Sequence, residues 1–152
     1  MTHYWLMKSE PTCFSIDDLA RKPQQTEPWD GVRNYQARNF LQAMKKNDQA
    51  FFYHSSCLSP GIMGIVEIIK IAYPDKTEVD PSDHHYDPKS KPDKPQWFCV
   101  DVKLVKKFKQ PITLKTLKKQ SALATMRLLQ KGNRLSVMPI TAKEWEAILK
   151  LL

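Results

Sequence analysis

The run of residues 62–73 constrains this fold most, because both of its alternating sets of side chains are largely apolar. Val66 and Ile68 fall on one face of an extended chain, and Ile65 and Ile69 fall on the other. A strand that is apolar on both faces is normally buried on both faces. The chain is therefore expected to pack a layer of structure on each side of this strand.

Four more strands are predicted from the alternation of apolar with polar residues. They span residues 3–8, 49–56, 97–107 and 134–138. Because proline has no amide proton to give to a sheet, Pro11, Pro111 and Pro139 are expected to end three of these strands or the turns after them. In the second strand, Phe51 and Tyr53 share one face, and Phe52 and His54 share the other.

Short helices are predicted between the strands. Ser15 with Asp18, and Thr141 with Glu144, form capping boxes at the starts of the first and last helices. Asn34 is a favourable N-cap. Since strands and helices do not alternate as βαβ units, the pattern favours an α+β fold around a mixed or antiparallel, partly closed barrel. Residues 35–46 and 121–131 are predicted to form further helices, the last ending before Gly132, and residues 112–117 a short helix or turn.

Two segments are predicted to be loops. Residues 23–28 hold two prolines, and residues 74–96 hold five. The second loop is long enough to be functional, mobile or both, and its residues 87–90 are interpreted as a lid over a neighbouring pocket or as plain surface. Its acidic and histidine residues match no metal motif, so no metal site is predicted there. These residues are Asp80, Asp83, His84, His85 and Asp87.

Residues 29–39 (WDGVRNYQARN) combine groups that recognise flat polar ligands. Trp29 offers an apolar face, Gly31 permits a tight turn or close backbone approach, and Asn34 carries a donor and an acceptor on one amide. Together they suit a pocket for a nucleobase-like ring at the start of a helix. The alternative is structural: Trp29 anchors the core, Gly31 closes a turn and Asn34 only caps the helix.

The formal charge of +8 is concentrated in the C-terminal third. Residues 1–100 hold 12 Lys or Arg and 13 Asp or Glu, a net charge of −1, whereas residues 101–152 hold 12 and 3, a net charge of +9. Such a surplus is typical of a surface that meets phosphate, and also of a lysine-rich surface that keeps a protein in solution.

Other features narrow the protein class. Cys13, Cys57 and Cys99 form no CxxC pair, which argues against a disulfide framework or a zinc site. Cys13 and Cys99 are expected to be buried, and Cys57 lies in a predicted loop. No apolar run is long enough to cross a bilayer and no secretory signal is visible, so a cytoplasmic protein without membrane contact is expected.

Several motifs together resemble the EVE domain family over nearly the whole chain. They are residues 4–11 (YWLMKSEP), 29–39, 51–55 (FFYHS), 73–75, 87–90 (DPKS) and 134–137. The resemblance implies one PUA-like domain over residues 1–152, a partly closed mixed β-barrel of about five to six strands with peripheral short helices. It also implies a non-catalytic, nucleic-acid-binding role without a cofactor, in which an aromatic pocket holds a modified base such as a modified cytosine.

Carried over position by position, the resemblance places thirteen residues at the ligand. The expected ligand-binding residues are Lys8, Ser9, Glu10, Trp29, Gly31, Val32, Arg33, Asn34, Tyr53, His54, Ser55, Asp87 and Lys89. From the charge distribution, the residues expected to contact phosphate are Lys103, Lys106, Lys107 and Lys109.

Two other functions compete with this interpretation. One is a nucleotide-processing or other small-molecule enzyme that uses His54 with Glu10 or Asp87, although no activated nucleophile or metal motif is visible. The other is a protein-interaction domain whose basic third binds an acidic partner. A monomer without an obligate protein partner is expected, and the sequence leaves the choice of DNA or RNA open.

Overall fold

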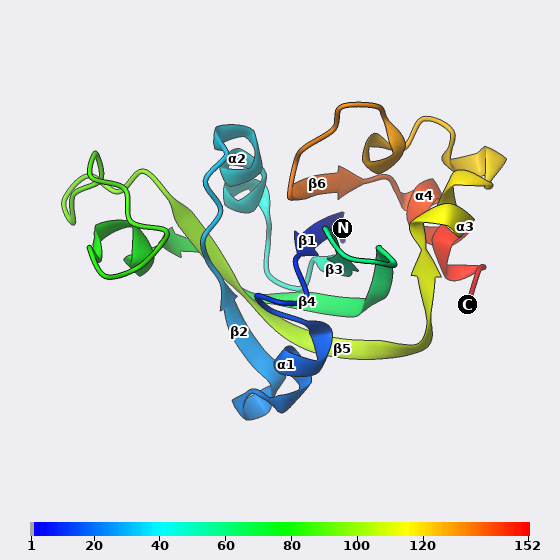
Figure 1. Cartoon of the computed structure of the whole chain (residues 1–152), viewed down its shortest axis with the longest axis horizontal. Coiled ribbons are helices and arrows are strands. Elements are labelled where there is room, and N and C mark those ends of the chain that lie inside the picture. The colour runs from blue at the N-terminus through cyan, green and yellow to red at the C-terminus, as the bar shows by residue number, and fades with distance from the viewer. Residues whose placement is uncertain (1) are drawn as a thin grey trace.

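The computed structural model describes residues 2–152 and is built on one six-stranded mixed sheet (Figure 1). Strand β1 pairs with β3 in parallel, and the other neighbouring strands pair antiparallel. The sheet is not closed, because β2 and β6 form its two edges, which agrees with the expected partly closed α+β barrel. In order across the sheet, the strands are β2 (Thr26–Trp29), β5 (Phe98–Thr113), β4 (Gly61–Pro74), β3 (Gln49–His54), β1 (Tyr4–Ser9) and β6 (Val137–Ile140).

The sheet separates two buried apolar clusters. In β1, Trp5 and Met7 belong to one cluster and Leu6 to the other, so alternate side chains serve opposite faces. Strand β4 does the same, with Val66 in the first cluster and Ile65 in the second. Two-sided burial of β4 is therefore confirmed for residues 61–68. At the far end the strand runs outward, and Ile71 is 57% exposed.

Four short α-helices pack around the sheet: α1 (Ile16–Arg21), α2 (Tyr35–Ala43), α3 (Leu114–Lys118) and α4 (Ala142–Leu149). Both predicted capping boxes are present, at Ser15 for α1 and at Thr141 for α4. The Asn34 side chain accepts a hydrogen bond from the amide of Ala37 at 2.9 Å, which confirms it as the N-cap of α2. Each cap satisfies an amide that the helix itself leaves unpaired.

Three prolines lie inside strands, contrary to prediction. Pro111 and Pro139 were expected to end strands, and Pro28 was expected to lie in a loop. Pro28 lies in β2, which was predicted to be loop, and Pro139 lies in β6. Both belong to edge strands, where an amide that faces away from the sheet has no partner to lose. Strand β5 continues beyond Pro111 to Thr113, because the register between β4 and β5 shifts there and frees that position from regular pairing.

The predicted helix over residues 121–131 is wrong. The segment instead forms two 3₁₀ turns, η3 (Ser121–Leu123) and η4 (Arg127–Leu129). Leu123, Met126 and Leu128 are buried as the apolar pattern requires, but a spacing of three residues fits 3₁₀ turns as well as an α-helix. The side chain of Gln130 donates to the carbonyls of Ala124 and Met126, and so satisfies groups that a continuous helix would pair.

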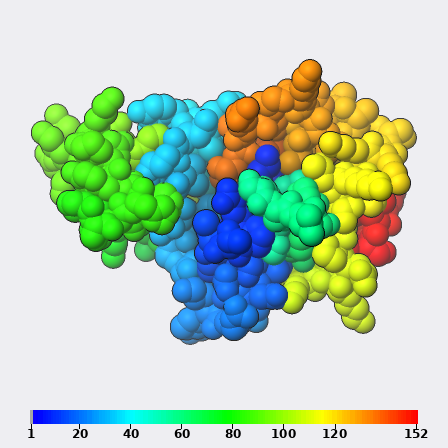
Figure 2. Space-filling view, viewed as in Figure 1, coloured from blue at the N-terminus to red at the C-terminus, as the bar shows by residue number. Residues whose placement is uncertain are grey.

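The long irregular segment between β4 and β5 projects as a lobe, coloured green in Figure 1. We call residues 75–97 the lobe; it begins with the 3₁₀ turn η2 (Lys76–Val79). In Figure 2 it lies to the left of the dark blue segment that follows β1, on the same face of the molecule. The lobe therefore stands beside the C-terminal end of β1.

Two other expectations concern exposure. Cys99 is buried as predicted, whereas Cys13 is exposed. The prediction for Cys13 is wrong because the residue lies on the turn after β1 and not in the core. Among residues 2–152, no helix has the length and apolar character that crossing a membrane requires.

Candidate functional site

A cavity of about 630 Å³ lies where three segments meet: the end of β1, the loop that joins β2 to α2, and the lobe. Its size falls in the usual range for small-molecule and cofactor sites. The parallel pairing of β1 with β3 fixes the first segment, since Lys8 lies opposite Tyr53 and Ser9 opposite His54. The lining residues are Lys8, Ser9, Glu10, Cys13, Phe14, Glu27, Pro28, Trp29, Asp30, Gly31, Val32, Arg33, Asp83, His84, His85 and Ser136.

The structure brings seven of the thirteen sequence-predicted ligand residues to this cavity. They come from two motifs that are separated in the sequence, one at the end of β1 and one at the end of β2. The seven are Lys8, Ser9, Glu10, Trp29, Gly31, Val32 and Arg33. The six that do not line it are Asn34, Tyr53, His54, Ser55, Asp87 and Lys89.

Trp29 serves the core and the cavity at once. It is 7% exposed and packs edge-on against Phe52, with ring centroids 5.3 Å apart and planes at 85°. It also lines the cavity, so an opening lies beside the indole. Trp29 is therefore both an anchor of the core and part of the cavity wall.

Gly31 is required at the cavity for two reasons. Its φ of +79° lies in the left-handed region that side chains with a Cβ avoid. In addition, a Cβ at this position would stand 2.6 Å from Cε1 and Nε2 of His85. The backbone of Gly31 and the ring of His85 thus form one packed wall between the β2–α2 loop and the lobe.

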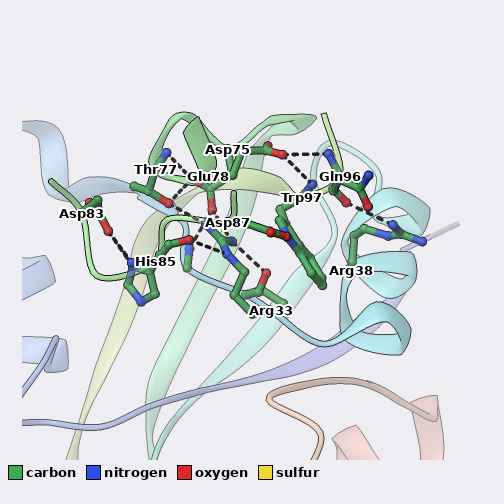
Figure 3. A network of polar contacts seen from close by, with 12 residues as sticks. Arg33, Arg38, Asp75, Thr77, Glu78, Asp83, His85, Asp87, Gln96 and Trp97 are labelled. Carbon is green, nitrogen blue, oxygen red and sulfur yellow. Dashed lines mark hydrogen bonds and ion pairs between the residues drawn. The ribbon is translucent and has the colours of Figure 1, made fainter. Parts of the chain in front are cut away.

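Asp75 is the acceptor that joins the lobe to the rest of the site (Figure 3). Its side chain is 1% exposed and accepts from the amide of Gly31 at 2.8 Å and from Nη1 of Arg33 at 3.0 Å. Thr77 adds two more donors, its amide and its hydroxyl. Burial alone would raise the pKa of Asp75, but these hydrogen bonds outweigh it and hold the pKa below its usual value.

Arg33 reaches into the lobe from the loop between β2 and α2. Its Nε donates to the carbonyl of His85 at 2.9 Å, and Nη2 donates to the hydroxyl of Thr77 at 2.8 Å. The guanidinium also lies 5.5 Å from the ring centroid of Trp97. All of these partners lie 42 or more residues along the chain, so Arg33 ties the β2–α2 loop to the lobe.

A second buried carboxylate organises the inside of the lobe. Oε1 of Glu78 accepts from the amides of Gln96 and Trp97. The indole of Trp97 donates to Asp87 at 2.7 Å, a contact that lowers the pKa of Asp87. Asp87 is therefore used within the lobe, which explains why it does not line the cavity. Residues 87–90 accordingly form part of this bonded lobe.

The strand β3 residues predicted for the site have structural partners instead. Tyr53 is 3% exposed in the second apolar cluster, and burial raises its pKa to about 12. Nε2 of His54 accepts from the amide of Ile16 at 3.1 Å, and burial lowers the pKa of His54. The amide of Ser55 donates to the carbonyl of Ser9, so this residue extends the β1–β3 pairing behind the cavity.

The four lysines expected to contact phosphate lie on β5, away from the cavity lining. Lys107 pairs with Asp17 on α1. Lys106, Lys107 and Lys109 border a separate hollow of about 470 Å³ that also includes the C-terminal residues Leu151 and Leu152. Closer to the cavity, Arg134 is exposed two residues before the lining residue Ser136.

Sequence reasoning missed nine of the lining residues. Asp30 lay inside the motif that was singled out, and Ser136 lay inside the last motif of the resemblance, so both had a signal in the sequence. The lobe residues were considered from the sequence only as metal ligands, because their place at the cavity depends on the long-range contacts of Asp75 and Arg33. Asp83, His84 and His85 place one potential metal-ligand atom each within 4.8 Å of one another at the rim.

Comparison with known proteins identifies the family of this chain. A model of the EVE domain matches residues 3–151. The chain belongs to the EVE domain family. Thymocyte nuclear protein 1 of Mus musculus is 49% identical over 168 residues, which cover 99% of this chain and 74% of that protein.

Solved structures of EVE-domain relatives agree closely with the fold. A crystal structure of a Pseudomonas syringae protein has a TM-score of 0.94 at 55% identity and covers 97% of this chain and 98% of its own. Human THYN1 protein, in complex with 5-methylcytosine-containing DNA, has a TM-score of 0.94 at 47% identity, with 99% and 97% covered. A YTH domain from Zygosaccharomyces rouxii shares the fold at 14% identity and a TM-score of 0.56.

Proposed function

We propose that this protein is a non-catalytic nucleic-acid-binding domain that holds one modified base, such as a modified cytosine, in the cavity beside Trp29. The observation that carries the proposal is the joint lining of this cavity by Lys8–Glu10 and by Trp29–Arg33, the two most distinctive motifs of the chain. The 47% identical human relative supports it, since that protein has been crystallised with DNA that contains 5-methylcytosine.

The cavity offers suitable contacts for a flipped base. An indole wall contributes on the order of 1–3 kcal/mol when a base stacks on it. Val32, which is buried and lines the cavity, provides apolar surface for a methyl-sized group, and this adds about 1–3 kcal/mol of discrimination. A base that leaves its helical stack can reach such a pocket as a single nucleotide.

Phosphates are proposed to bind the basic surface outside the cavity. Lys103, Lys106, Lys107 and Lys109 remain our proposed phosphate contacts, and exposed Arg134 joins them because it lies close in sequence to the cavity. Contacts of this kind position the nucleic acid without reading its sequence, and they weaken as salt is added. We therefore expect a salt-sensitive background affinity that does not depend on the base in the cavity.

A reader is favoured over the enzyme that was considered from the sequence. That mechanism paired His54 with Glu10 or Asp87. His54 instead accepts a backbone hydrogen bond from Ile16, and Asp87 accepts from Trp97. Of these three residues only Glu10 lines the cavity, so the proposed acid and base do not share a site. A turnover assay on modified nucleotides, with His54→Ala as the control, tests this choice directly.

The remaining expectations form part of the same proposal. We propose a single domain over residues 1–152 that acts as a monomer, needs no cofactor or membrane, and is found in the cytoplasm. The vertebrate relatives are named as nuclear proteins, which makes localisation a separate measurement. Binding to an acidic protein would instead be salt-sensitive and indifferent to nucleic acid.

The test is binding of labelled single-stranded oligonucleotides at physiological salt. The oligonucleotides carry 5-methylcytosine, cytosine or an abasic position at one central site. The wild type should bind the modified oligonucleotide best, and Trp29→Ala should remove that preference while the salt-sensitive background remains. Because Trp29 also packs in the core, Trp29→Phe is the second variant, and thermal unfolding of both reports whether they fold. Equal wild-type affinity for all three oligonucleotides would refute the proposal.

A further inference from the structure

Most polar atoms at the cavity already have partners within the protein. The amide of Gly31 donates to Asp75, and Arg33 is bound to the lobe. The hydroxyl of Ser9 donates to the carbonyl of Phe14 at 2.6 Å, so its oxygen can only accept. What a ligand meets is therefore decided by the few charged groups that remain.

Asp30 is one of these remaining groups. Within residues 2–152 its carboxylate has neither a hydrogen bond nor an ion pair, although it lines the cavity. Trp29 and Asp30 line the same cavity, so a ring held there against the indole can present one edge to the carboxylate. An ionised carboxylate has only acceptors, and it therefore requires a donor on that edge.

The charges around the cavity also favour a ligand that donates hydrogen bonds. Glu10, Glu27, Asp30 and Asp83 contribute four carboxylates, against the two cations Lys8 and Arg33. Glu27 is neutralised by Lys22 at 3.3 Å, and Arg33 by Asp75. The balance leaves the interior unfavourable to phosphate and favourable to an uncharged ring that offers N–H groups.

The surroundings of Asp30 disfavour the ionised form of its side chain. Burial, and then repulsion from Asp75 and Glu27, raise the pKa of Asp30, while His85 opposes that shift. Asp30 is nevertheless exposed, so its unpaired carboxylate stays open to solvent and to a ligand in the cavity. Perturbed groups of this kind concentrate at functional sites.

We propose that Asp30 is the specificity-determining residue of the cavity and selects a base with an exocyclic amine over one with an oxo group at the same position. This inference rests on the proposed function. Cytosine presents an N4 amine that donates, whereas thymine presents an O4 that accepts. The carboxylate accepts from the amine and repels the oxo oxygen. The Lys8 ammonium, which also lines the cavity, can donate to the acceptors of the ring.

The decisive comparison is 5-methylcytosine against thymine, because the two rings carry the same methyl group and differ in the amine. Each base is placed at the central site of a single-stranded oligonucleotide, so that no pairing partner differs between them. The wild type should prefer 5-methylcytosine by about ten- to a hundredfold, the usual effect of one hydrogen bond to a charged group. Asp30→Asn, whose amide both donates and accepts, should reduce the ratio to within about threefold.

Two variants act as controls. Asp93→Asn removes one negative charge from an exposed position of the lobe that does not line the cavity, so it should keep the wild-type ratio. Glu10→Gln tests another exposed carboxylate that lines the cavity. If Glu10→Gln loses the preference for 5-methylcytosine over thymine and Asp30→Asn keeps it, the assignment to Asp30 is overturned. An unchanged ratio in Asp30→Asn would overturn it as well.

The wild type alone separates this inference from the proposed function. If an abasic oligonucleotide binds as tightly as the one with 5-methylcytosine, no base is held and both ideas fail. If base-dependent binding is present but thymine binds as well as 5-methylcytosine, the reader survives and the role of Asp30 does not.

Discussion

Substituting Gly31 by alanine tests the wall between the β2–α2 loop and the lobe. The change adds one methyl group at a φ of +79°, and that methyl group would lie 2.6 Å from the ring of His85. Gly132 provides a matched control in the same chain. Its φ is +80°, and a Cβ there would meet nothing within 4 Å.

The two variants separate a backbone cost from a packing cost. Left-handed backbone costs a residue with a Cβ about 1–2 kcal/mol, and this cost alone should appear in Gly132→Ala. Gly31→Ala should cost more, because the His85 ring must also move. Overpacking usually costs about 1–3 kcal/mol, and the lower end applies to a partly exposed ring that can rotate. We expect Gly31→Ala to lose about 2–3 kcal/mol in total.

Urea unfolding followed by tryptophan fluorescence measures both free energies of unfolding. In a protein that already carries His85→Ala, adding Gly31→Ala should cost only the backbone part of the free energy of unfolding. That cost should be about the same as the cost of Gly132→Ala in the wild type. Base binding, measured in the same samples, should weaken in Gly31→Ala because the displaced ring lines the cavity.

Equal losses for Gly31→Ala and Gly132→Ala would refute the reasoning, since they would show that His85 does not pack on Gly31. The same conclusion would follow if removing the His85 ring did not relieve the Gly31→Ala variant.

Three more predictions follow from the network and the caps. Asp75→Asn should destabilise the protein by about 3–5 kcal/mol, because it leaves Arg33 half-buried without its carboxylate; urea unfolding measures this. The pKa of Asp75 is lowered in the folded protein, so its contribution to stability is complete above the ordinary value of 3.8 and is lost as pH falls through the lower folded pKa. Over that pH range, the stability of the wild type should fall more steeply than that of Asp75→Asn. The pKa of Asp30 is raised, so its stabilising contribution is present at low pH and lost as pH rises; Asp30→Asn should therefore raise Tm at pH 7 but not at pH 3, and a lower Tm at pH 7 would contradict the assigned cost. Ser15→Ala should cost about 1 kcal/mol by thermal unfolding through loss of the α1 cap, and no change would show that the capping box contributes nothing.

The features that were predicted correctly depend on neighbours in the sequence. A capping box needs residues three apart, and both boxes form as expected at Ser15 and Thr141. The faces of β3 follow from alternation alone, so Phe51 and Phe52 divide between the two clusters as predicted. These interactions are local, and the residues that make them can be read directly from the chain.

Proline misled the prediction because its effect depends on position in the sheet. The rule that proline ends a strand assumes a partner on both sides. Pro28 and Pro139 lie on the two edge strands, and Pro111 lies at an irregular pairing, so each avoids the hydrogen bond it cannot make. Sheet order is decided by contacts between distant segments, and the sequence pattern does not reveal which strands will be edges.

In the candidate site too, residues in local motifs were predicted from the sequence, and residues placed by long-range contacts were not. The motifs at Lys8–Glu10 and Trp29–Arg33 were found from the sequence, because each packs several recognition groups into a few residues. Asp83 and His85 were not, since their place at the cavity depends on Asp75 and Arg33, which lie more than 40 residues apart.

The lobe shows why composition alone gives an incomplete prediction of loop behaviour. Five prolines and many charges favour an irregular segment, and it is irregular. Its order comes from two buried carboxylates, Asp75 and Glu78, which pair with backbone amides and with Arg33. An ionised group that is buried must be paired, so each of these carboxylates fixes the segments that supply its donors. Asp30 differs from both carboxylates, because it is exposed at the cavity and has no hydrogen-bond partner among the described residues. The donor that it lacks is the one we assign to the ligand.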